Sequence, residues 1–77
     1  MFDYEILDGL KKEIKNKYPS LYKKIASKEL QIDIVSIIKV HDDYYISVID
    51  KKQHERAKLK FNYNKGNSKI ENVEIVD

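Results

Sequence analysis

The chain has no cysteine, no threonine and no tryptophan, and it has only two glycines, one proline and one arginine. Without cysteine there is no disulfide framework, no thiolate metal site and no cysteine nucleophile. The two glycines are too few and too far apart for a phosphate-binding loop. No run approaches the roughly 20 apolar residues of a membrane span, and the first residues are acidic where a signal peptide is basic. We therefore expect a cytoplasmic protein with no membrane partner.

What the chain does have is typical of one small folded domain, which we place at residues 1–77. Its hydrophobic fraction of 42% is ordinary for a globular protein. Lysine, isoleucine, asparagine and tyrosine make up 36 of its 77 residues. These residues have A/T-rich codons, which indicates a low-GC bacterium, a phage or a mobile element as the source.

Two helices are predicted at the start of the chain. Apolar residues recur there at steps of three and four, which predicts a helix over about 3–18 with Asp3 as its N-cap. Pro19 ends this helix and favours a short second one over about 20–27. Gly9 weakens the helix interior by about 1 kcal/mol relative to alanine, or lets another element approach closely. The residues expected to face inward are Ile6, Leu7, Leu10, Ile14, Tyr18, Leu21, Tyr22 and Ile25.

Further along the chain the apolar residues recur at about every second position, which predicts four strands over about 30–40, 44–50, 55–64 and 68–76. In the last strand the apolar positions slip phase, which predicts a bulge near Asn72. Short breaks between strands favour an antiparallel meander with the helices on its apolar face, an α+β fold. This order of elements resembles that of cystatin-like domains in shape, without a shared motif.

The first strand is expected to alternate between two faces along its whole length. Its second face is half apolar, so we expect something to pack over part of its back. One face would carry Leu30, Ile32, Ile34, Ser36, Ile38 and Val40, and the other Gln31, Asp33, Val35, Ile37 and Lys39.

Nothing in the sequence has the pattern of a catalytic or metal site. His41 and His54 fall in separate predicted turns, so they cannot share one metal ion. No serine lies in a Gly-x-Ser-x-Gly elbow. Asp42 and Asp43 are adjacent in a turn, where successive side chains diverge. We therefore expect no enzyme activity, no metal and no cofactor.

The net charge of +2 hides strongly charged blocks. Residues 9–28 and 51–69 each sum to +6, and the three segments around them sum to −3, −4 and −3. If both basic blocks face one way, they would form a surface for nucleic acid, which is the alternative function. Its candidate residues are Lys11, Lys12, Lys15, Lys51, Lys52, Arg56, Lys58 and Lys60.

A protein-binding surface is the first functional hypothesis. Tyr44 and Tyr45 are consecutive, so in a strand one of them must point away from the core. Exposed tyrosine is common at protein interfaces. With Val35 and Ile37 on the back of the first strand, these residues predict a contact with a protein partner or a second copy. The expected function is that of a small non-catalytic inhibitor or regulator.

Overall fold

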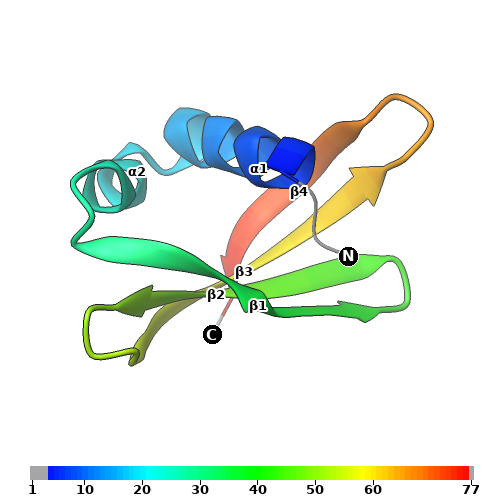
Figure 1. Cartoon of the computed structure of the whole chain (residues 1–77). Coiled ribbons are helices and arrows are strands. Elements are labelled where there is room, and N and C mark those ends of the chain that lie inside the picture. Colours follow the sequence, from blue (N-terminus) through cyan, green and yellow to red (C-terminus); the bar gives the residue numbers. More distant parts are fainter. Residues whose placement is uncertain (1–3, 77) are drawn as a thin grey trace.

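The computed structural model describes residues 4–76 and confirms the α+β fold predicted from the sequence (Figure 1). Two helices lie on one side of a four-stranded antiparallel sheet whose strands follow chain order. The predicted cap Asp3 lies outside the described residues. The elements are α1 (Tyr4–Lys17), α2 (Pro19–Ala26), β1 (Leu30–Val40), β2 (Asp43–Asp50), β3 (Glu55–Asn64) and β4 (Lys69–Val76).

The two helices meet at Tyr18 and Pro19, as the sequence predicts. Tyr18 has a non-helical backbone (φ −132°), and Pro19 opens α2, where its missing N–H needs no partner. Gly9 faces β4 so closely that a Cβ atom there would lie 3.0 Å from Cγ1 of Ile70. The close-approach interpretation of Gly9 is therefore correct, and α1 packs on β4 and on α2.

The core lies between the helices and the sheet. Leu10 and Ile14 are fully buried and one helical turn apart, which explains why α1 forms an amphipathic helix. In β3 the buried Leu59 and Phe61 alternate with Lys58 and Lys60, as expected for a strand with one wet face. The core cluster consists of Leu10, Ile14, Ile25, Leu30, Ile46, Val48, Leu59, Phe61, Ile70 and Val73.

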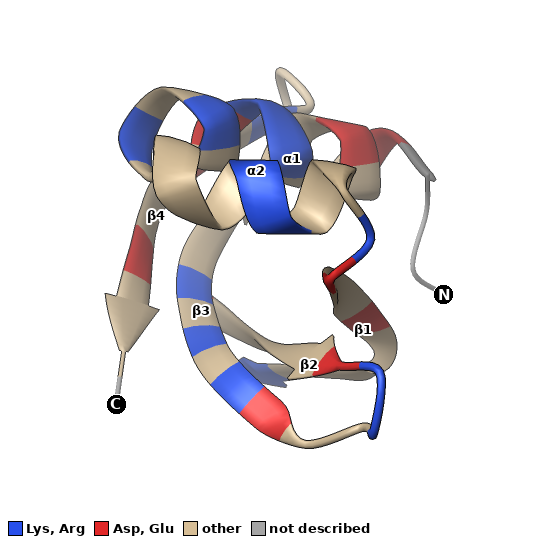
Figure 2. Cartoon of the chain, turned by 90° about the vertical axis from the view of Figure 1, so that its left-hand side faces the viewer, with Lys and Arg blue, Asp and Glu red and all other residues tan. Residues whose placement is uncertain are grey.

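Each pair of neighbouring strands contains a register shift. The bulge predicted near Asn72 is confirmed: the register of β3 and β4 shifts between Lys60 and Asn62, and Asn72 has a φ of 56°. Bulges increase local twist and bend a strand. Figures 1 and 2 show a strongly twisted sheet that curves around the helices. The helix α1 packs on β4 and α2 packs on β1, and the first turn of α1 faces the second half of β1 across a groove.

Candidate functional site

Exposed apolar side chains gather on one edge of the sheet. Of the five large hydrophobic residues exposed in the described part of the chain, four lie on β1, the first strand in the sheet order. The fifth, Ile75 at 43% exposure, lies on β4 at the other edge. Soluble monomers rarely gather apolar side chains in this way unless the surface binds something. We call the β1 set the apolar edge: Ile34 (42% exposed), Val35 (89%), Ile38 (54%) and Val40 (46%).

A bulge in β1 produces this exposure. Asp33 pairs with Ser47 and Ile38 with Tyr45, so the four residues 34–37 stand opposite Ile46 alone. The hydroxyl of Ser36 closes the gap, because it accepts a hydrogen bond from the N–H of Ser47 (2.9 Å) and donates one to the carbonyl of Asp33 (2.7 Å). The extra residues therefore loop outward at Val35 while the sheet stays bonded behind them.

The predicted alternation of β1 is wrong beyond Asp33, because the bulge changes its phase. Ile32 pairs with buried Val48 before the bulge, whereas Ile37 packs against the core after it. The expected inward positions Ile34, Ile38 and Val40 are exposed instead. The doublets Ile34-Val35 and Ile37-Ile38 around Ser36 are the sequence signal for this slip, since a regular strand cannot bury both members of a doublet.

The two tyrosines lie on opposite faces, as their adjacency requires. Tyr44 packs against the core and stacks on Phe61, with ring centroids 5.5 Å apart and an interplanar angle of 13°. Tyr45 lies on the face away from the helices, between Ile38 and Lys60. The four predicted binding residues thus do not form one patch: Val35 is exposed and Tyr45 is half-buried on the face away from the helices, whereas Tyr44 and Ile37 pack on the core.

Beside the apolar edge, on the helix side, is a groove of about 430 Å³, which we call the β1 groove. It runs between the first turn of α1 and the second half of β1. Most of its walls are aliphatic or aromatic, and among the described residues that line it two lysines are the only cations. The lining residues are Ile6, Ile34, Ile37, Ile38, Lys39, Tyr44, Tyr63 and Lys65.

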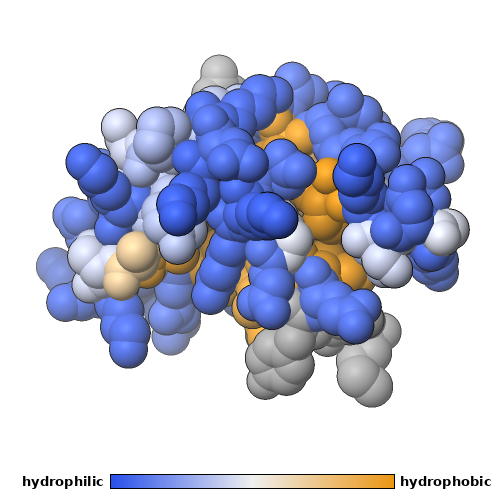
Figure 3. Space-filling model, turned by 90° about the horizontal axis from the view of Figure 1, so that it is seen from above, coloured by the Kyte–Doolittle hydropathy of each residue, from blue (hydrophilic) through white to orange (hydrophobic). Residues whose placement is uncertain are grey.

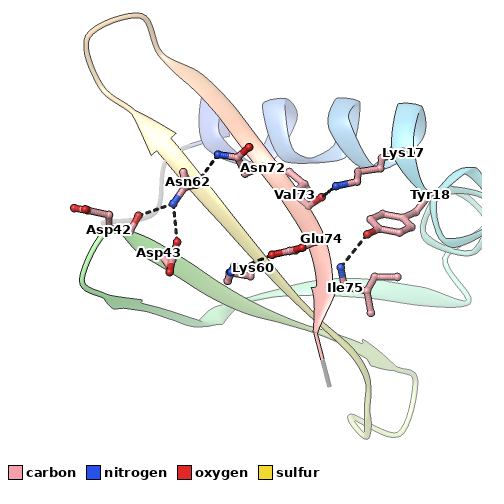
Figure 4. Close-up of polar contacts among 10 residues, drawn as sticks. All are labelled: Lys17, Tyr18, Asp42, Asp43, Lys60, Asn62, Asn72, Val73, Glu74 and Ile75. Atoms are coloured by element: carbon pink, nitrogen blue, oxygen red, sulfur yellow. Dashed lines mark hydrogen bonds and ion pairs between the residues drawn. The ribbon is translucent and has the colours of Figure 1, made fainter.

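The opposite edge of the sheet is capped by side chains from the end of α1 (Figure 4). Tyr18 accepts a hydrogen bond from the N–H of Ile75 (3.2 Å), and Lys17 donates one to the carbonyl of Val73 (2.5 Å). These backbone groups are therefore not free to pair with another strand. Of the two edge strands, β1 is therefore the less protected.

The face of the sheet away from the helices carries a polar network (Figure 4). The amide of Asn62 donates to a carboxylate oxygen of Asp43 (2.8 Å) and to the carbonyl of Asp42 (2.9 Å), and its oxygen accepts from Asn72 (2.9 Å). Lys60 forms an ion pair with Glu74 (3.0 Å), which raises the pKa of Lys60, chiefly through their hydrogen bond. This network spans β2, β3 and β4 and fixes the bulge at Asn72.

The two basic blocks lie mainly on different layers of the fold. In the second block Arg56, Lys58 and Lys60 lie on β3, where Lys58 and Lys60 point away from the helices and pair with acids at 3.8 and 3.0 Å. Most lysines of the first block lie on the helical layer (Figure 2), and two of them, Lys17 and Lys24, line a groove together with Arg56 of the second block. Figure 3 shows that hydrophilic side chains cover most of this helical side.

Asp50 organises the turn between β2 and β3. Its carboxylate accepts hydrogen bonds from the N–H groups of Lys52 (2.9 Å) and His54 (3.0 Å) and lies 3.7 Å from the guanidinium of Arg56. The hydrogen bond from His54 is the main reason that the pKa of Asp50 lies below its ordinary value of 3.8. Partial desolvation acts in the opposite direction, and Lys52 and Arg56 add to the lowering. These contacts give Asp50 a structural role.

A larger groove of about 740 Å³ lies between the helix junction and the ends of β3 and β4. Its cations are Lys17, Lys24 and Arg56, and its acids are Glu29 and Asp50. Lys17 and Arg56 are already engaged by Val73 and Asp50. Because both positively and negatively charged side chains line this groove, its charge favours no particular ligand.

His41 occupies a left-handed turn position (φ 57°) and is exposed. Within residues 4–76, no three His, Asp or Glu side chains come together as a metal site would require.

None of the helices described is long and apolar enough to cross a membrane. Comparison of the chain with protein-family models, with curated proteins and with solved structures finds no match.

Proposed function

We propose that this chain is a small non-catalytic protein-binding module, of the inhibitor or regulator type, that binds its partner at the edge strand β1. The observation that carries the proposal is the concentration of exposed apolar side chains on β1, opposite an edge that Tyr18 and Lys17 cap. An open edge binds an extended segment through backbone hydrogen bonds, and neighbouring side chains give specificity.

The bulge sets how a partner strand would pair. Regular strand runs on both sides of it, over residues 30–33 and 38–40. Val35 projects between these two segments at 89% exposure, where a partner that crosses the bulge must contact it. The shape of β1 therefore supports binding of an extended segment that pairs at one side of the bulge and packs on Val35.

The proposal is tested with a random-peptide display library selected on the wild-type protein. Selected peptides are then measured against two matched variants, Ile38→Ser on β1 and Ile75→Ser on β4, after circular dichroism shows that both fold. We expect Ile38→Ser to weaken binding by about tenfold or more, as for an apolar residue central to an interface, and Ile75→Ser to leave it unchanged. Equal binding by both variants, or no selected peptide, would contradict the proposal.

Nucleic-acid binding is a second candidate, now restricted to the helical layer. Residues 9–28 contain seven lysines and one acid, Glu13, and no lysine of this segment forms an ion pair with another described residue. Lysines that bind DNA phosphates displace counterions from the DNA, so the binding affinity falls steeply as the salt concentration rises. Retention on duplex DNA at about 50 mM salt and its loss by about 200 mM would support this function, and no retention at the lower salt would exclude it.

A further inference from the structure

The β1 groove combines an apolar interior with positive charge at its rim. Ile6, Ile37 and Tyr44 line it, and within residues 4–76 Lys39 and Lys65 are its only lining groups that are charged at neutral pH. Neither lysine forms an ion pair with a described acid. The ammonium of Lys39 lies 5.5 Å from the ring centroid of Tyr44, over the aromatic wall.

Acidic residues lie nearby but form no ion pair with these lysines. A neighbouring groove of about 450 Å³ shares Lys39 and Lys65 and has Asp42 and Glu71 in its walls. Asp42 accepts a hydrogen bond from Asn62 at its backbone carbonyl, and no ion pair joins either acid to either lysine. The rim of the β1 groove therefore carries two cations that a bound carboxylate would meet.

A second copy of this chain fits the edge poorly. If residues 38–40 paired antiparallel with their own copy about a two-fold axis at Lys39, Ile38 would face Val40 and Lys39 would face Lys39. Like charges directly opposite each other in a sheet destabilise the pairing. A foreign segment with an acid at that position would instead gain an attractive contact.

We propose that the partner presents an extended, acidic and apolar segment: a β-branched or aliphatic side chain enters the β1 groove while a neighbouring carboxylate lies between Lys39 and Lys65. This inference rests on the proposed function and adds the chemistry of the partner. Burial of an aliphatic side chain away from water supplies the affinity. The two lysines select the sign of charge and raise the association rate.

The test uses three fluorescent synthetic peptides that share a Val-Ile-Val-Ile centre and carry glutamate, glutamine or lysine on both flanks. Anisotropy measures their binding to the wild type, to Lys39→Glu/Lys65→Glu and to a control on α2, Lys23→Glu/Lys24→Glu, which has the same net charge. We expect the glutamate peptide to bind the wild type at least about tenfold more tightly than the lysine peptide. The groove variant should reverse this order, and the α2 variant should keep it.

Three outcomes would overturn the inference. If all peptides bind equally and both double variants behave alike, charge does not select the partner; a loss on Ile38→Ser would then still uphold binding at β1. If the charge preference changes as much in the α2 variant, it arises from net charge alone. If light scattering finds a dimer that Ile38→Ser dissociates, the occupant of the edge is a second copy.

Discussion

The phenolic oxygen of Tyr18 accepts a hydrogen bond from the N–H of Ile75 at 3.2 Å, across 57 positions of the chain. With Lys17, which donates to the carbonyl of Val73, it joins the end of α1 to the last strand. One edge of the sheet is thereby occupied by the protein's own side chains. The binding function proposed for β1 depends on this asymmetry between the two edges.

Tyr18→Phe removes the acceptor and keeps the ring. We expect a loss of about 0.5 to 1.5 kcal/mol in the free energy of unfolding, measured by urea denaturation, because one partly exposed hydrogen bond is lost. The amide of Ile75 should exchange faster with solvent, while the amides of β2 keep their protection. An unchanged exchange rate at Ile75 would show that Tyr18 does not cap this edge.

Ser36→Ala tests the closure of the β1 bulge. The N–H of Ser47 would lose its acceptor in a partly buried place, which costs about 1 to 3 kcal/mol. The matched control Ser20→Ala, at an exposed position of α2, should change stability by less than about 0.5 kcal/mol. Equal stability of the two variants would mean that the hydroxyl of Ser36 is not needed to close the bulge.

Gly9→Ala tests the close contact of α1 with β4. Alanine raises helix propensity by about 1 kcal/mol, but its Cβ would lie 3.0 Å from Cγ1 of buried Ile70. Overpacking of this kind costs about 1 to 3 kcal/mol, so we expect a net loss of stability. In an Ile70→Ala background the clash is gone and Gly9→Ala should stabilise. A double-mutant cycle that shows no coupling would contradict the contact.

Asp50→Asn tests the charge at the turn between β2 and β3. The folded pKa of Asp50 lies below its ordinary value, so its ionised form stabilises the fold above the unfolded-state pKa of about 3.9. This contribution disappears as the pH falls through the lower folded value. The wild type should therefore be more stable than Asp50→Asn at neutral pH, and the difference should shrink below about pH 4. A difference that stays constant down to about pH 2.5 would refute this role.

The sequence predicted the element order and the bulge near Asn72, because both depend on local periodicity. The phase slip of Ile70 and Val73 predicts the bulge at Asn72, whereas the two-residue alternation of isoleucines through Ser36 predicts one regular strand there. A regular strand would place Ile38 and Val40 inside and Ile37 outside, and the structure shows the opposite because of the bulge.

Other parts of the site have no local signal. The capping of β4 by Tyr18 and Lys17 depends on where α1 ends relative to a strand that lies more than fifty positions later in the chain. The β1 groove brings Ile6, Lys39 and Lys65 together from three separate elements or turns. Likewise, the two basic blocks lie mainly on different layers because the helices pack over the sheet. Charge sums along the chain do not predict this layering.

The most direct test of the account is hydrogen exchange with and without a bound peptide from the display selection. We predict that the peptide slows exchange of the backbone amides of β1, over residues 30–33 or 38–40, and leaves the amides of β4 and of both helices unchanged. Slower exchange confined to β4 or to the helices, with β1 unaffected, would contradict the claim that β1 is the binding edge.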